Sequence, residues 1–268
     1  LTPEIRFHGI VHEFLTPTYL PIKDFNTWVE HYGYFFDNDA DQYKHVERNV
    51  SLLWKQLEME PNVLHWYTQL IQEYMGIKEY ARVLELCEKA FCIYDRLETV
   101  DTAQLRSAGV LYSFGASACL RKYDYAGAEH WARRGIKDKR LYDCARAHLY
   151  LLEAEACQKE EKYQESLRAF LNYIEIYRKK GQDKYAIANE TALINNMVFQ
   201  EISLICTTLT GLVSAARTHD RGILEEYFYT LDWTDKRLFG QEELEKALLE
   251  YACEEPCDSL ARMVRTMG

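Results

Sequence analysis

Two short stretches near the start of the chain carry the residues best suited to chemistry. The stretch IRFHGIVHEFL contains His12 and Glu13, and TWVEHYGYFF contains His31. A neutral imidazole can bind a divalent cation, and a carboxylate can orient a hydroxyl group or accept its proton. A structural interpretation competes with each role: the histidines could hydrogen-bond across paired strands, and Glu13 could cap a loop.

The elements that must position these side chains are predicted to be strands. Polar and apolar residues alternate with a period of two over residues 5–15 and 24–33, and Pro17 and Pro21 separate the two stretches. We therefore expect a short β-hairpin within residues 1–36. Two strands alone are marginal in water, so the hairpin should pack on the following helix through Val46, Val50 and Trp54, or pair with another copy.

The sequence Asp37-Asn38-Asp39 has the Asp-x-Asp spacing of some metal sites. A short polar side chain here also predicts a helix N-cap, because its oxygen can accept a hydrogen bond from an amide of the first turn. We favour the cap, since an apolar stripe at helical spacing follows and ends before Pro61.

A repeat of two helices and a turn follows; its first unit spans residues 62–93, with the turn at Gly76-Ile77-Lys78. Shifting the first unit by 45 residues, and then by a further 38, reproduces the pattern, with turns at 122–124 and 160–162. Large residues on the first helix and small ones at the crossing are typical of tetratricopeptide (TPR) repeats. Other α-solenoids share this periodicity, and the units are longer than the usual TPR period of about 34 residues.

The predicted fold class is therefore mainly α: a TPR-like α-solenoid of stacked helical hairpins preceded by a short β-hairpin. Residues 37–180 form the repeats, and residues 181–268 form a diverged repeat with capping helices, because an open solenoid end must cover its apolar face. One long helix, or two joined around Thr210-Gly211, is expected over residues 185–217, and further helices are expected over 221–233, 241–253 and 257–267.

Composition excludes several classes of protein. The 268-residue chain has a net charge of −10, which argues against nucleic acid as a partner. No apolar run is long enough to cross a membrane, and the eight cysteines are expected to be reduced, packed thiols in a cytoplasmic protein rather than disulfides or a zinc site.

Two further groups of residues are assigned structural roles. Most tyrosines occupy expected packing positions, namely Tyr67, Tyr74, Tyr80, Tyr112, Tyr125, Tyr150 and Tyr163. The charge run Lys159-Glu160-Glu161-Lys162 is expected to be a solvated helix face.

Three ordered motifs resemble a known family. They are Phe7-His8-Gly9-Ile10-Val11-His12-Glu13-Phe14-Leu15, then His31-Tyr32-Gly33-Tyr34, then Glu47-Arg48-Asn49-Val50-Ser51-Leu52-Leu53. This order is similar to the junction in bacterial family 2 glycosyltransferases where a catalytic domain of the GT-A type is followed by TPR repeats. The resemblance covers the first sixty residues closely and the repeats in architecture.

The resemblance implies a role for each candidate residue. His12, or else His31, would complete the coordination of Mn²⁺ or Mg²⁺ in the parent enzyme, and Glu13 would act near the acceptor. The nucleotide-sugar binding segment and its Asp-x-Asp motif do not occur in this chain, and Leu1 stands where a methionine would begin a protein. We therefore expect a C-terminal portion of a longer enzyme, without a cofactor and catalytically silent by itself.

The resemblance also implies partners: a nucleotide sugar for the parent enzyme, and for the repeats an acceptor peptide or protein, or a second copy. One rival is a stand-alone TPR scaffold that binds proteins or peptides. A helical enzyme with its own active site has little support, because no acid/base or nucleophile motif occurs within the repeats.

Overall fold

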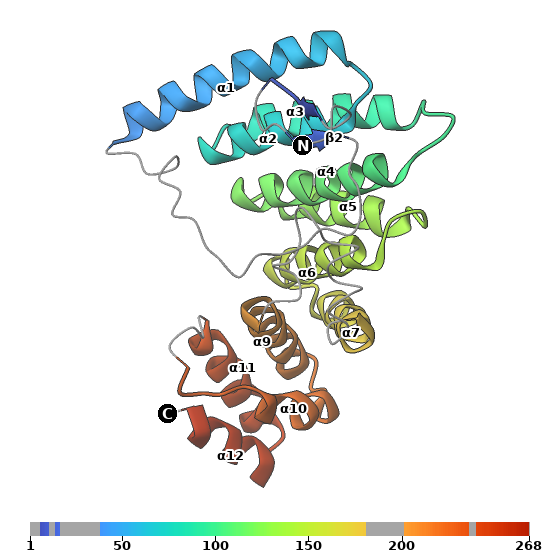
Figure 1. Cartoon of the computed structure of the whole chain (residues 1–268). Coiled ribbons are helices and arrows are strands. Elements are labelled where there is room, and N and C mark those ends of the chain that lie inside the picture. The colour runs from blue at the N-terminus through green and yellow to red at the C-terminus, as the bar shows by residue number, and fades with distance from the viewer. Residues whose placement is uncertain (1–5, 11–13, 17–37, 181–200, 236–239, 268) are drawn as a thin grey trace. The chain divides into compact units, whose positions relative to one another are not determined.

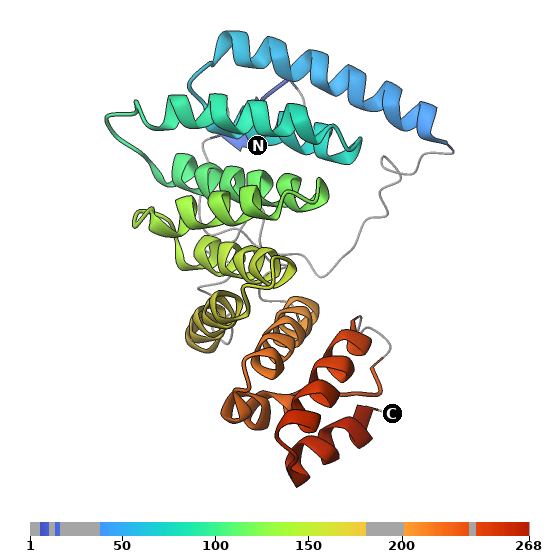
Figure 2. The same cartoon turned by 180° about the vertical axis from the view of Figure 1, so that it is seen from behind.

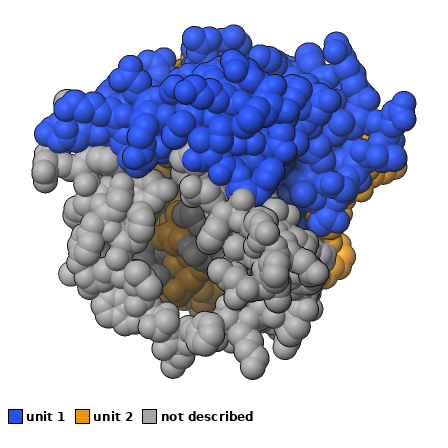
Figure 3. All heavy atoms as spheres, turned by 45° about the horizontal axis from the view of Figure 1, so that its top comes forward, with its two compact units in different colours: residues 1–107 blue, residues 108–268 orange. Residues whose placement is uncertain are grey.

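The computed structural model describes residues 6–10, 14–16, 38–180, 201–235 and 240–267 and is mainly helical. The chain divides into two compact units, Leu1–Ser107 and Ala108–Gly268, which Figure 3 colours separately. The division falls inside one helix. The domain boundaries expected after residues 36 and 180 remain predictions.

The first unit begins with two short strands, β1 (Arg6–His8) and β2 (Phe14–Thr16). They pair antiparallel, with His8 opposite Phe14. The prediction of one strand across residues 5–15 is therefore wrong, because Gly9 interrupts it with a φ of 105°, a conformation that glycine adopts without a steric penalty. The predicted partner strand, 24–33, lies outside the described residues.

Three helices complete most of this unit: α1 (Asp39–Met59), α2 (Leu64–Gly76) and α3 (Tyr80–Tyr94). The cap interpretation of Asn38 is confirmed, since its Oδ1 accepts a hydrogen bond from the Asp41 amide at 3.0 Å. Helix α1 packs on α2, and α2 packs on α3. Helix α4 (Thr102–Arg121) begins in this unit and ends in the second.

The second unit continues as consecutive helices (Figures 1 and 2). They are α5 (Tyr125–Lys137), α6 (Asp143–Lys159), α7 (Tyr163–Lys180), α9 (Glu201–Arg217), α10 (Arg221–Tyr227), the short 3₁₀ helix η2 (Phe228–Thr230), α11 (Gln241–Glu254) and α12 (Asp258–Met267). Helices α11 and α12 match the expected ranges to within one residue, whereas α10 and η2 together end at Thr230, before the expected residue 233. Helix α9 covers the described part of the expected range 185–217. The arrangement is consistent with an α-solenoid-like fold. No helix within the described ranges is long and apolar enough to span a membrane.

The same tight turn recurs between the helices of four hairpins. One non-glycine residue in each turn has a φ of 59–63°; these residues are Lys78, Tyr123, Glu161 and His219. The next residue donates its amide to a carbonyl five positions earlier, as from Asp124 to Cys119 at 2.9 Å. This is the Schellman arrangement, which satisfies the carbonyls left free at the end of a helix. The fourth turn, between α9 and α10, shows that the diverged unit keeps the same hairpin geometry.

Small residues lie where helices of the second unit cross. A Cβ atom on Gly115 would lie 2.5 Å from the Trp131 ring, and one on Gly135 would lie 2.5 Å from Leu149. Four alanines on these helices are fully buried: Ala116, Ala128, Ala132 and Ala154. The close approach of the helices therefore depends on residues with little or no side chain.

The expectations for tyrosine and cysteine are met in part. Tyr67 and Tyr112 are buried, whereas the other five tyrosines assigned to packing are half-buried. All eight cysteines are free thiols, but Cys92, Cys206 and Cys253 are exposed, so the prediction of packed thiols is wrong for these three. Burial raises the pKa of the Cys119 thiol to about 11, which makes it a poor nucleophile.

Candidate functional site

The three residues predicted to carry chemistry, His12, Glu13 and His31, lie outside the described residues. Their roles as metal ligands or base therefore remain predictions. Within the part of the chain that the structure describes, no group of three or more His, Cys, Asp or Glu side chains is arranged to hold a metal ion.

A polar cluster in the first unit joins β1 to the helices, and we call it the Glu60 cluster. The Glu60 carboxylate accepts hydrogen bonds from Trp66 Nε1 and Gln56 Nε2, each at 2.7 Å, and its Oε2 lies 3.2 Å from His8 Nε2. The amide of Ile10 donates to Gln56 Oε1 at 3.1 Å. Both the backbone after β1 and a side chain from it are thus held at the C-terminal end of α1.

This attachment differs from the expected one. We predicted that the strands would pack on Val46, Val50 and Trp54, or pair with another copy. In the described part of this segment, His8 and the Ile10 amide form hydrogen bonds at Glu60 and Gln56, and the His8 ring centroid lies 5.8 Å from that of Trp66. Helix α1 packs on α2, and its residue Val46 is buried. Trp54 instead lies under the amine of Lys89, 5.2 Å from the ring centroid.

Hydrogen bonding controls the charge of Glu60. Burial by itself raises the pKa of this carboxyl, but the donors Trp66, Gln56 and His8 outweigh burial and hold the pKa below its ordinary value of 4.5. The ionised form is therefore favoured in the folded protein. A carboxyl with a lowered pKa contributes stability at neutral pH, and this contribution is lost as the pH falls below about 4.5.

The variant Glu60→Gln should remove this pH-dependent contribution. We expect it to be less stable than the wild type at pH 7 by about 1 kcal/mol, which is below the ~1.5–3 kcal/mol typical of hydrogen bonds to charged groups because solvent screens this partly exposed site. The difference should shrink at pH 4, because the wild-type carboxyl begins to be protonated there. Urea unfolding at both pH values measures it, and a difference that grows on acidification would contradict this explanation. Glu58→Gln, an exposed neighbour on α1, is the matched control.

The motif residue Asn49 also has a structural role. It is 1% exposed, and its amide donates to Glu73 Oε1 of α2 at 2.7 Å, while Arg48 Nη2 donates to its side-chain oxygen at 3.0 Å. Leu53, four residues further along, is fully buried. The ERN-x-x-LL motif thus fixes α1 on α2 through one buried amide and the apolar residues that follow it.

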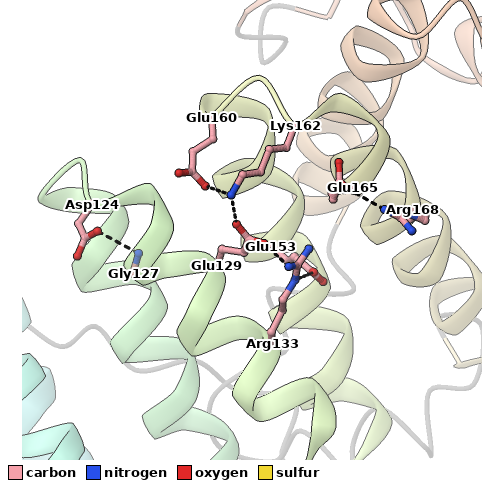
Figure 4. A network of polar contacts seen from close by, with 9 residues as sticks. All are labelled: Asp124, Gly127, Glu129, Arg133, Glu153, Glu160, Lys162, Glu165 and Arg168. Atoms are coloured by element: carbon pink, nitrogen blue, oxygen red, sulfur yellow. Dashed lines mark hydrogen bonds and ion pairs between the residues drawn. The ribbon is translucent and has the colours of Figure 1, made fainter.

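A chain of charges crosses α5, α6 and the turn before α7 in the second unit (Figure 4). Arg133 forms ion pairs with Glu129 on its own helix and, at 2.7 Å, with Glu153 of α6. Lys162 contacts Glu129 at 2.7 Å and Glu160 at 2.9 Å. Glu129 and Glu153 are only 7% and 8% exposed, so the cations neutralise two buried carboxylates.

The sequence did not reveal this network. The run Lys159-Glu160-Glu161-Lys162 is mostly exposed, as predicted for a solvated face. The prediction missed its ion pairs, since Lys162 joins two hairpins and Lys159 lies 3.9 Å from Glu243 of α11. Glu129 and Lys162 are 33 positions apart, and no local pattern indicates their pairing. Spacing within one helix could have suggested only the pair Glu129 and Arg133, which are four residues apart.

An open groove of about 470 Å³ adjoins this network. Helices α5, α6 and α7 line it with Arg133, Ile136, Lys137, Tyr150, Glu153, Glu165, Arg168, Ala169 and Asn172. Its volume lies in the range of small-molecule sites, about 300–1,000 Å³. We call it the α5–α7 groove.

Comparisons with models of protein families, with curated proteins and with solved structures find no match to this chain.

Proposed function

We propose that this chain is the C-terminal part of a family 2 glycosyltransferase, in which TPR-like hairpins bind the acceptor or a second copy of the enzyme. The observation that carries the proposal is the order of three motifs in the first sixty residues: VHE, HYGY and ERN-x-x-LL. The parent enzyme would transfer a sugar from a nucleotide-sugar donor in the cytoplasm.

The first unit supports this proposal by the way its two parts are connected. β1 belongs to the motif segment, and the Glu60 cluster fixes it to α1 and α2 through His8 and Ile10. Asn49 fixes α1 to α2 in turn. A segment that ends a catalytic domain would thus be joined to the first hairpin by buried or half-buried polar contacts, as expected where a helical domain positions an acceptor for a catalytic domain.

The chemistry of the parent enzyme is assigned by motif position alone. A divalent cation, Mn²⁺ or Mg²⁺, would neutralise the diphosphate of the donor. His12 is the first candidate ligand, His31 the second, and Glu13 would orient or deprotonate an acceptor hydroxyl.

The repeated hairpins support the partner role. Stacked hairpins present the faces of successive helices side by side, and such surfaces bind extended or helical peptides. The turn that recurs in four hairpins indicates that the repeats share one geometry over most of the described helices.

Two experiments test the proposal. The isolated chain, given nucleotide sugars and Mn²⁺, is expected neither to transfer nor to hydrolyse sugar, whereas the chain expressed together with its natural upstream sequence should do so. That upstream sequence should encode a GT-A domain with an Asp-x-Asp motif. A DNA-binding or signalling domain in its place would refute the proposal.

The alternative is a stand-alone TPR scaffold for proteins or peptides. It predicts a gene that begins with this chain and binding of a partner without any glycosylation of it. The segment with the VHE and HYGY motifs, which the sequence predicts to form strands, favours the glycosyltransferase, because a scaffold has no need of such a segment.

A further inference from the structure

The charges that line the α5–α7 groove do not cancel. Three cationic side chains face it, Arg133, Lys137 and Arg168, against two carboxylates, Glu153 and Glu165. Glu153 pairs with Arg133 at 2.7 Å, and Glu165 pairs with Arg168 at 3.0 Å. This leaves the positive charge of Lys137 uncompensated at the groove, although the chain as a whole carries a net charge of −10.

Three polar groups in the groove are also without a protein partner. Within the described residues, Lys137, Tyr150 and Asn172 make no hydrogen bond or ion pair. They come from three helices, since Lys137 ends α5, Tyr150 lies on α6 and Asn172 lies on α7. An ammonium, a phenol and an amide all donate hydrogen bonds. The free groups of the groove are therefore suited to a ligand that accepts hydrogen bonds and carries negative charge.

The neighbouring network holds this part of the molecule in place. Arg133 lies one turn before Lys137 on α5, and its ion pairs with Glu129 and Glu153 fix α5 against α6. Helix α7 packs on α6 and is tied to it by the buried Ser166 hydroxyl, which donates to the Ala154 carbonyl at 2.8 Å. The three free groups thus lie on helices whose mutual positions are fixed. A ligand could therefore bind without the helices having to rearrange, and little binding free energy would be lost.

We propose that the α5–α7 groove binds a small oxyanion, a phosphate monoester or a carboxylate. Lys137 is its ion-pair partner, and Tyr150 and Asn172 donate hydrogen bonds to it. The site adds to the proposed function and does not depend on it, because it lies wholly within the second unit and uses none of the motif residues.

Titration of the full chain with inorganic phosphate at constant ionic strength, followed by the ³¹P transverse relaxation rate, tests this proposal. Saturable binding is expected, and it should weaken as salt is added, because exposed charges are screened. Malonate is the second probe. If malonate binds and displaces phosphate, both share the site; if only one of the two binds, the natural ligand belongs to that chemical class.

Matched variants show whether the groove is responsible. Lys137→Ala should weaken binding about tenfold, as for the loss of one charge-assisted hydrogen bond. Lys139→Ala removes an exposed lysine that does not line the groove, and should change the affinity less than about twofold, since only the net charge differs. Tyr150→Phe, which removes a single hydroxyl, should weaken binding about threefold.

Two outcomes would overturn the proposal. One is that neither phosphate nor malonate binds saturably to the wild-type chain at low ionic strength. The other is that Lys137→Ala and Lys139→Ala lose the same affinity, which would indicate attraction by general charge alone. The melting temperature of each variant verifies that it is folded.

Discussion

Replacing Phe170 by alanine is expected to destabilise the protein by about 3–5 kcal/mol, the range measured for truncating a buried phenylalanine. Phe170 is fully buried in α7 and meets the Tyr227 ring edge-on, with 5.2 Å between the ring centroids. A Cβ atom on Gly211 of α9 would lie 2.5 Å from its ring. One side chain therefore fills the space between α7, α9 and α10, and its loss leaves a cavity that rigid helices cannot close.

Urea unfolding followed by circular dichroism measures this loss. The matched control is Leu249→Ala, which truncates a side chain that is 46% exposed on α11, and should cost less than about 1 kcal/mol. Equal losses in the two variants would show that the hairpins from α7 to α10 do not share a packed core.

Replacing Arg133 by methionine is expected to cost about 2–4 kcal/mol at pH 8, because removing one partner of a buried ion pair leaves an uncompensated charge. Arg133 is itself 41% exposed, which places the expected value below that of a fully buried pair. Lys162 continues to neutralise Glu129, but Glu153 loses its partner. Glu153, which is 8% exposed in the wild type, would then have no ion-pair partner.

The loss should depend on pH in a defined direction. Burial raises the pKa of Glu153, and the bond from Arg133 only partly opposes this effect. A carboxyl whose pKa is higher in the folded than in the unfolded state reduces stability once it ionises. Without Arg133 its pKa should rise further, so the destabilisation should be large at pH 8 and smaller at pH 5.

A double substitution and a surface control complete this test. Replacing both Arg133 and Glu153 by methionine should recover most of the lost stability, since apolar residues of similar size need no counter-charge. Arg82→Met removes an arginine that is 49% exposed and pairs with Glu85, which is itself 66% exposed, and should cost less than about 1 kcal/mol. A loss that is independent of pH would show that Arg133 acts through packing alone.

Local patterns in the sequence were sufficient to place most of the helices and turns. The N-cap at Asn38, the turns at 76–78, 122–124 and 160–162, and the small residues at helix crossings all appear in the structure. These features are determined by residues within one or two turns of each other, through capping and the 3.6-residue period. The interruption of the predicted strand at Gly9 was missed, because alternation of side chains does not reveal a positive φ.

The contacts that define the candidate sites depend on residues far apart in the chain. His8 meets Glu60 across 52 positions, and Lys162 meets Glu129 across 33. Hydrophobic periodicity places charged residues on an outer face but does not specify which of them meet, since that depends on how the helices stack. The two buried carboxylates, the cation between them and the groove beside them therefore appear only when α5, α6 and α7 are packed together.

The sequence by itself thus determined a helical-repeat chain, the positions of its turns, and the three motifs that suggest a glycosyltransferase. Only the tertiary structure decided that His8 of β1 meets Glu60, and that Lys137, Tyr150 and Asn172 line one groove. The physical reason is one of range: helix propensity and capping act over a few residues, whereas burial and ion pairing depend on neighbours that only the packed fold brings together.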